Sequence, residues 1–253
     1  MKNTESGRRS FIAQVALGSL AALSIPEIVL AAIPEAKSQK VTLENNDSIL
    51  FQGDSITDSG RNRTNADYNS QNGLGGGYAF LAAAELLLKY PAKNLQIYNR
   101  GISGNKVYQV AETWDADSIN LKPDVLSILI GVNDYWHTLS HGYKGTTETY
   151  KKDYRTLLQR TKDKLPDVKL IIGEPFAILG TAVNQTWFPA IKEYQMVSRE
   201  LANEFDAAFV PYQKVYDQAL KYAPGAYWSA DGVHPSIAGA SLMAQAWLKV
   251  VKA

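Results

Sequence analysis

Short apolar runs alternate with longer helical stretches through most of this chain, and this alternation limits the possible folds more than any other feature. A brief run rich in branched and aromatic side chains is typical of a parallel strand that is covered on both faces. We expect such strands at residues 49–51, 95–99, 125–130, 168–173 and 207–210. Strands separated by helices in this way predict an α/β fold, with a parallel sheet between two layers of helices.

The predicted helices lie between these strands and after the last one. In the longest of them, Tyr154, Leu157 and Leu158 share an apolar face. The predicted helices are residues 79–90, a segment around 107–111, and residues 148–164, 187–205 and 237–251. A chain of 253 residues suffices for one large domain, and no break in composition suggests a second. We therefore expect a single domain over residues 33–253.

Residues 1–32 do not fit this pattern and have the layout of an export signal peptide. The pair Arg8-Arg9 directly precedes a moderately apolar segment, which resembles a bacterial twin-arginine signal. A membrane anchor is the alternative, but Pro26 and Glu27 interrupt the segment before it reaches the roughly 20 apolar residues that a membrane span needs. We expect cleavage near the end of this range and a periplasmic or extracellular protein.

Composition argues against several classes of function. With 26 basic and 25 acidic residues, the chain lacks the positive excess that binding to a nucleic-acid backbone requires. The absence of cysteine excludes disulfides, thiolate nucleophiles and Cys-ligated zinc, and three histidines argue against a His-rich metal site. We expect no metal, no cofactor, no nucleic-acid partner and no stable membrane insertion after removal of the leader. The residues indicate no particular oligomeric state.

A hydroxyl lies at the carboxyl end of the first predicted strand. Residues 48–57 read as a buried strand that ends in a turn of small residues, Gly53-Asp54-Ser55. Ligands bind at this edge of open α/β sheets. On its own, the turn could serve only to let Asp54 or Ser55 cap the next helix. Three later segments supply further polar groups.

A glycine cluster at residues 73–77 precedes the first long helix. It fails the dinucleotide-binding pattern because Tyr78 takes the sixth position, and no Lys-Ser or Lys-Thr follows for a phosphate loop. This weakens the alternative of a nucleotide- or flavin-binding protein. We expect a mobile loop beside the site.

Four segments together resemble the sequence blocks of the SGNH, or GDSL, hydrolases. They are Gly-Asp-Ser-Ile-Thr at 53–57, Asn-Arg-Gly-Ile-Ser-Gly at 99–104, Gly-Val-Asn-Asp at 131–134 and Asp-Gly-Val-His-Pro at 231–235. They occur in the family's order over residues 48 to about 250. The resemblance implies a flavodoxin-like, three-layer α/β/α fold with a central, mostly five-stranded parallel sheet, and an esterase that forms an acyl-serine intermediate.

The side chains in these segments have the chemistry that acyl transfer needs. A serine hydroxyl such as Ser55 becomes nucleophilic when a base takes its proton, and His234 is the candidate base. Asp231, three residues earlier, can accept from one ring nitrogen and leave the other facing Ser55. The resemblance assigns the oxyanion donors to the backbone N–H groups of Ser55 and Gly104 and to the side-chain amide of Asn133.

Other polar residues have simpler expected roles. Asp54 and Asp134 are expected to bond backbone groups in their turns. His137 and His141 are expected in a polar loop, at the surface or in a pocket wall. Asp231 and His234 could instead cap a helix that starts near Pro235. The α/β-hydrolase fold is disfavoured because Thr57 breaks its Gly-x-Ser-x-Gly pattern.

Aromatic side chains in the expected site loops could stack on sugar rings, or could pack the loops instead. These residues are Tyr135, Trp136, Tyr143, Tyr227 and Trp228. The predicted substrate contacts are Asp54, Tyr135, Trp136 and Trp228. Export and family analogy favour removal of acetyl or other short acyl groups from carbohydrates. The alternatives are a lysophospholipase, a general short-chain esterase, or a catalytically silent carbohydrate-binding protein, which the intact set of site residues disfavours.

Overall fold

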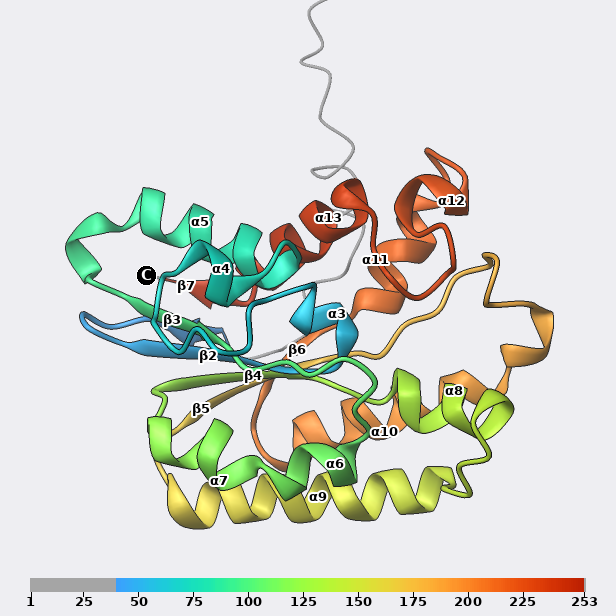
Figure 1. The fold of residues 1–253 in the computed structure, drawn as a ribbon, viewed down its shortest axis with the longest axis horizontal. Helices are drawn as coiled ribbons and strands as arrows, with labels where there is room; N and C mark the ends of the chain where they lie inside the picture. The colour runs from blue at the N-terminus through green and yellow to red at the C-terminus, as the bar shows by residue number, and fades with distance from the viewer. Residues whose placement is uncertain (1–39, 253) are drawn as a thin grey trace, which may run out of the picture.

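A five-stranded parallel sheet forms the middle of the protein in a computed structural model that describes residues 40–252 (Figure 1). Its strands are β2 (Ser48–Gly53), β3 (Gln96–Asn99), β4 (Val125–Leu129), β5 (Lys169–Gly173) and β6 (Ala208–Val210). Their order in the sheet is β3-β2-β4-β5-β6. This confirms the predicted α/β fold with its parallel sheet. The predicted export signal, residues 1–32, lies outside the described residues.

Helices cover both faces of the sheet (Figure 1). One layer contains α3 (Ser55–Asp58), α4 (Gln71–Leu74), α5 (Tyr78–Lys89), α11 (Tyr212–Ala219), α12 (Gly225–Trp228) and α13 (Ile237–Leu248). The other contains α6 (Val107–Glu112), α7 (Trp114–Asp117), α8 (Val132–Ser140), α9 (Thr147–Lys164) and α10 (Ala190–Glu204). Short 3-10 helices are η1 (Pro91–Lys93), η2 (Ile119–Leu121) and η3 (Gln185–Trp187). Within residues 40–252, no helix has the length and apolar character needed to cross a membrane.

The strand order places three strand ends together. The chain passes from β2 to β3 on one side of the sheet and then returns to β4 on the other side of β2. In doubly wound sheets, the carboxyl ends of the strands at such a reversal form the crevice where ligands bind. Gly53 at the end of β2 pairs with Leu129 of β4, so the turns that follow these two strands start at the same level.

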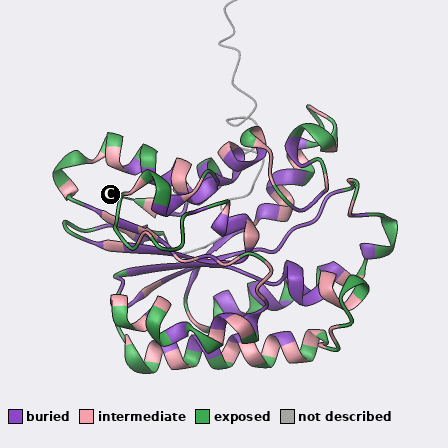
Figure 2. Ribbon diagram, viewed as in Figure 1, coloured by how far each residue is buried: buried purple, intermediate pink, exposed green. Residues whose placement is uncertain are grey.

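The core lies between the sheet and the inner faces of the helices (Figure 2). All five residues of β4 are buried, as expected for a strand covered on both faces. Large aromatic side chains fill the space next to β2, where the ring of Phe51 lies 4.9 Å from that of Trp247. The buried indole N–H of Trp247 donates to Ser127 Oγ at 2.9 Å, which satisfies the one polar group that this side chain brings into the core.

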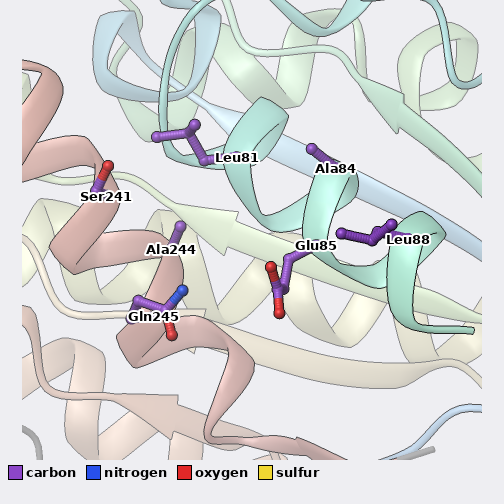
Figure 3. Close-up of a pocket in the computed structure, with 7 residues that line it drawn as sticks. All are labelled: Leu81, Ala84, Glu85, Leu88, Ser241, Ala244 and Gln245. Atoms are coloured by element: carbon purple, nitrogen blue, oxygen red, sulfur yellow. The ribbon is translucent and has the colours of Figure 1, made fainter. Parts of the chain in front are cut away.

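The two helices α5 and α13 lie side by side and leave a shallow groove on the outside of their layer (Figure 3). Leu81, Ala84, Glu85, Leu88, Ser241, Ala244 and Gln245 line it. None of these residues belongs to the four sequence segments of the predicted site.

Several elements depart from the sequence expectations. Residues 132–140 form helix α8, so His137 is helical and His141 is the C-cap of the helix, not part of a polar loop. Helix α8 begins at Val132, soon after β4, and its N-cap residue Gly131 has no side chain to cap it, so the usual N-terminal signal is missing. The last predicted helix ends at Leu248, and the chain then forms β7 (Val251–Lys252), which pairs in parallel with β1 (Val41–Thr42).

Candidate active site

Ser55 is the first residue of α3, directly beyond the end of β2. Asp54 caps this helix, because its Oδ1 accepts the backbone N–H of Ile56 at 3.0 Å. Ser55 Oγ lies 2.8 Å from Nε2 of His234, which is 179 residues further along the chain. The short strand, the cap and the helix therefore present the predicted nucleophile to the predicted base.

His234 is held in turn by Asp231. The distance from His234 Nδ1 to Asp231 Oδ2 is 2.6 Å. Asp231 Oδ1 accepts the backbone N–H groups of Val233 at 2.9 Å and of His234 at 2.8 Å. Partial burial alone would raise the pKa of Asp231, but the hydrogen bonds from His234 and Val233 outweigh it and hold the pKa below its usual range. A carboxylate on Nδ1 favours the tautomer in which Nδ1 carries the proton and Nε2 can accept from Ser55.

Ser229 and Gly232 shape the loop that carries these two residues. Ser229 is fully buried, accepts the N–H of Gly232 at 3.0 Å, and lies 3.1 Å from Asp231 Oδ1 and 2.8 Å from the carbonyl oxygen of His234. Gly232 has φ +93°, and a Cβ there would lie 2.1 Å from the carbonyl oxygen of Ile178. Only glycine fits this turn without displacing the loop. Sequence reasoning missed Ser229, although it lies two residues before Asp231.

The loop between β3 and α6 carries Gly104, which has φ +84°. The N–H of Ile102 in this loop donates to the carbonyl oxygen of Gly53 at 3.0 Å, next to Ser55. On the other side, Asn133 Nδ2 at the start of α8 donates to the carbonyl oxygen of Asn105 at 3.1 Å. Gly104 therefore lies in a loop that is bonded to both segments carrying the other predicted oxyanion donors. Asn133 is almost fully buried and has one amide hydrogen left to donate.

Two buried carboxyl groups flank these elements. Burial raises the pKa of Asp54 to about 7 and that of Asp134 to about 7. Asp134 accepts the N–H of Val107 at 3.2 Å, and Asp54 accepts the N–H of Ile56. Both carboxyl groups therefore bond backbone groups, as expected from the sequence. Asp54 is fully buried, which does not favour the predicted contact with substrate.

The three aromatic residues that were predicted to contact substrate differ in how far they are buried. Trp136 is partly exposed, and its ring lies 6.2 Å from the ring of His234. Tyr135 is buried against Trp187, and Trp228 is buried with its indole N–H donating to the carbonyl oxygen of Ala223. The positions of Tyr135 and Trp228 fit loop and core packing, whereas Trp136 borders the site.

The other two histidines lie along α8 and at its end. Lys106 Nζ lies 3.0 Å from Nδ1 of His137. Burial, and to a smaller extent the positive charge of Lys106, lowers the pKa of His137 to about 4. His141 Nδ1 lies 2.6 Å from Ser140 Oγ. In the part of the chain from residue 40 to residue 252, no three His, Cys, Asp or Glu side chains are grouped so that they could hold a metal ion.

The glycine cluster packs against the segment that follows the nucleophile. A Cβ on Gly75 would lie 2.6 Å from the carbonyl oxygen of Asp58, and one on Gly77 would lie 2.7 Å from the side chain of Ser59. This close approach gives the glycines a packing role, because larger residues would push α3 and this loop apart. The mobility of the loop stays a prediction.

Comparisons with known proteins agree with this arrangement. Residues 51–242 match the GDSL-like Lipase/Acylhydrolase family. An acetylxylan esterase of Geobacillus stearothermophilus is 34% identical over 212 residues, which cover 82% of this chain and 94% of that protein. The crystal structure of Axe2, an acetylxylan esterase from the same organism, has a TM-score of 0.75 at 32% identity, covering 82% of this chain and 95% of Axe2. A Parabacteroides merdae protein described as a GDSL-like lipase has a TM-score of 0.82 at 51% identity, covering 83% of this chain and 98% of its own. The chain therefore belongs to the GDSL-like lipase/acylhydrolase (SGNH) family and is a carboxylic ester hydrolase of that type.

Proposed function

We propose that this esterase removes acetyl or other short acyl groups from carbohydrates, through an acyl-serine intermediate on Ser55. The observation that carries the proposal is the continuous chain of short contacts from Ser55 Oγ to His234 Nε2 and from His234 Nδ1 to Asp231 Oδ2. In this proposal Ser55 is the nucleophile, His234 is the general base and then the general acid, and Asp231 orients the imidazole and stabilises its charged form.

The reaction follows from these contacts. Ser55 Oγ attacks the ester carbonyl and loses its proton to His234 Nε2, and the carbonyl oxygen becomes an oxyanion. The N–H groups of Ser55 and Gly104 and the free amide hydrogen of Asn133 donate to that oxyanion. As the intermediate collapses, the bond to the alcohol breaks and His234 gives its proton to the leaving oxygen. A water molecule, deprotonated by His234, then hydrolyses the acyl-serine and restores Ser55.

Structures of the relative Axe2 support the roles of the serine and the histidine. Two of them are described as catalytic mutants, one with a serine and one with a histidine replaced by alanine. By their printed numbers, those two residues lie 179 positions apart, which is the separation of Ser55 and His234. Both structures have a TM-score of 0.75 against this chain.

The position of Trp136 supports a sugar as the alcohol part of the ester. The leaving oxygen must come within reach of His234 Nε2, because that atom protonates it. The ring of Trp136 lies 6.2 Å from the His234 ring, so the leaving group has a partly exposed indole beside it. An aromatic face of this kind suits the apolar face of a sugar ring. The relation to an acetylxylan esterase points to the same class of substrate.

A substrate panel tests the proposal. Purified enzyme is assayed on nitrophenyl acetate, butyrate and octanoate and on acetylated xylo-oligosaccharides, with Ser55→Ala as the catalytic control. We expect the highest kcat/KM on acetyl esters, release of acetate from the oligosaccharides, and no turnover by Ser55→Ala. Trp136→Ala should raise KM for the oligosaccharides and leave KM for nitrophenyl acetate nearly unchanged.

The other outcomes would replace the proposal. Faster hydrolysis of octanoate than of acetate would favour a lipase-like or general esterase, in line with the description of the Parabacteroides merdae relative. Binding of the oligosaccharides without turnover of any ester would make the chain a carbohydrate-binding protein. Activity that survives in folded Ser55→Ala would remove Ser55 from the mechanism.

A further inference from the structure

Asp58 is a buried carboxylate that the proposed reaction does not use. It is the last residue of α3, three residues after Ser55, and is only 2% exposed. Its Oδ2 atom accepts from the backbone N–H and from the hydroxyl of Ser103, each at 2.9 Å, and from Arg63 Nη2 at 2.5 Å. A buried carboxylate is costly unless hydrogen bonds and a cation compensate it, and these three donors do so.

The two residues that Asp58 connects belong to different parts of the proposed oxyanion site. Ser55 lies at the start of the same short helix as Asp58. Ser103 directly precedes Gly104, and the planar peptide between them contains the N–H that Gly104 would donate. Bonds to the backbone N–H and the hydroxyl of Ser103 hold the Cα atom at which that peptide begins, and so restrict where the peptide can lie. Ser103 is itself exposed to solvent, so apolar packing does not hold it in place.

The rest of the loop has its own attachments. Near its start, Gly101 donates its N–H to Asn99 Oδ1 at 2.9 Å, and Arg61 Nε donates to the carbonyl oxygen of Gly101 at 2.8 Å. At the far end, Val107 N–H donates to Asp134, which follows Asn133 on α8. Between these two ends, side chains hold both neighbours of Gly104: Asp58 accepts from Ser103, and Asn133 donates to the carbonyl oxygen of Asn105.

We propose that Asp58 is a positioning residue that holds the Gly104 N–H in register with Ser55 for stabilisation of the oxyanion. The proposal rests on the proposed function, because it concerns the same reaction at the same site. Burial alone would raise the pKa of Asp58, but the hydrogen bonds from Arg63 and Ser103 outweigh it and hold the pKa below its usual range. Asp58 is thus a carboxylate at neutral pH, and its negative charge strengthens both bonds to Ser103.

Asp58→Asn is the variant that tests this role, because an amide of the same shape loses the charge that strengthens both Ser103 bonds. We expect kcat on nitrophenyl acetate to fall about ten- to hundredfold, the effect of a misplaced group at a reaction centre, while KM changes less than about twofold. The inhibition constant of methylboronic acid, which forms a tetrahedral adduct on the serine, should rise in parallel with the loss of kcat.

A matched control comes from the opposite end of β2. Asp47 is 6% exposed, accepts the N–H of Glu44 at 2.9 Å and lies 3.2 Å from Lys169 Nζ. Asp47→Asn therefore removes the same charge from a similar buried contact, far along the strand from Ser55. It should lower the melting temperature and leave kcat and the boronic acid affinity unchanged.

The outcomes separate the alternatives. Normal kcat in folded Asp58→Asn would overturn the proposal. An equally large loss of kcat in the control Asp47→Asn would also overturn it, because both losses would then reflect lowered stability. If Asp58→Asn fails to fold, Ser103→Ala decides: removal of its hydroxyl bond should lower kcat by about two- to tenfold at unchanged KM, and no loss would refute the role. Failure of the proposed function itself would appear differently, as activity retained in Ser55→Ala.

Discussion

Asn133 has two amide hydrogens, and the structure accounts for one of them. That hydrogen bonds the carbonyl oxygen of Asn105, which gives Asn133 a structural role in holding the loop of Gly104. The other hydrogen is available to an oxyanion. If it donates to charge that develops only in the transition state, Asn133→Ala should reduce kcat by roughly 10²–10³, equivalent to about 2.7–4 kcal/mol, with little change in KM. Steady-state kinetics on the folded variant measure this.

A second substitution at Asn133 distinguishes hydrogen-bond donation to the oxyanion from a purely structural role. Asn133→Asp should be at least as harmful as Asn133→Ala, because a carboxylate cannot donate and would repel the oxyanion. Thermal melts of both variants serve as the control for stability. A lowered melting temperature with near-normal kcat in the folded fraction would show that Asn133 only maintains its turn.

Single residues also show how far the sequence alone could reach. Ser55, Gly104, Asn133, Asp231 and His234 could be predicted as site residues because each lies in a short block with a recognisable pattern. Asp58 and Ser103 were missed, since their contact joins residues 45 positions apart and leaves no local signal. Tyr135 and Trp136 were treated alike, but neighbouring residues on a helix face different directions. One of them is therefore buried, and the other borders His234.

At the scale of whole elements, the strands were the most predictable part. Continuous apolar runs bounded by turn residues identified all five strands of the main sheet, with ends that differ by at most two residues. Two helices that lack a capping side chain were missed: α8 starts at Val132 and α11 at Tyr212, directly after the N-cap residues Gly131 and Pro211. The pairing of Val41 with Val251 joins opposite ends of the described chain, which local patterns do not indicate.

The end of β5 carries a titratable group whose effect on stability can be measured. Glu174 follows directly after β5, is 6% exposed, and accepts the N–H of Gln213 at 3.1 Å. Burial raises the pKa of Glu174 from 4.5 to about 7, although Arg199 and Gln213 oppose this. The neutral acid is thus favoured in the folded protein. The resulting stabilisation is complete below about pH 4.5 and is lost as the pH rises through about 7.

Glu174→Gln should remove most of this pH dependence, because the amide remains neutral. The full effect is on the order of 3 kcal/mol in the free energy of unfolding. We expect the melting temperature of the variant, relative to that of the wild type, to rise by several degrees between pH 4.5 and pH 8. Glu85→Gln, at an exposed position on α5, is the control and should show no such trend. A parallel pH dependence of Glu174→Gln and wild type would contradict the buried-acid interpretation.

Across the whole molecule, the sheet brings together segments that are distant in sequence. The turns after β2, β3 and β4 meet where the strand order reverses, and the loop before α13 places His234 against Ser55. The α/β class and the four site segments were enough to predict this meeting, because parallel strands present their carboxyl ends at one edge. The sequence could not predict the contacts that hold the loops, since these depend on the final packing.

The last prediction concerns the leader, which we propose directs export of the whole protein. Residues 1–32 have a pair of arginines before a moderately apolar segment, a layout typical of a twin-arginine signal. If the twin-arginine pathway recognises that signal, the double variant Arg8→Lys with Arg9→Lys should leave the full-length protein in the cytoplasm, although both substitutions keep the positive charge. Cell fractionation with mass spectrometry checks this, and the wild type should yield a periplasmic or secreted species that starts near residue 32. Unaffected export of the double variant would point to the general secretory route, and a soluble cytoplasmic wild type that still begins at Met1 would refute export altogether.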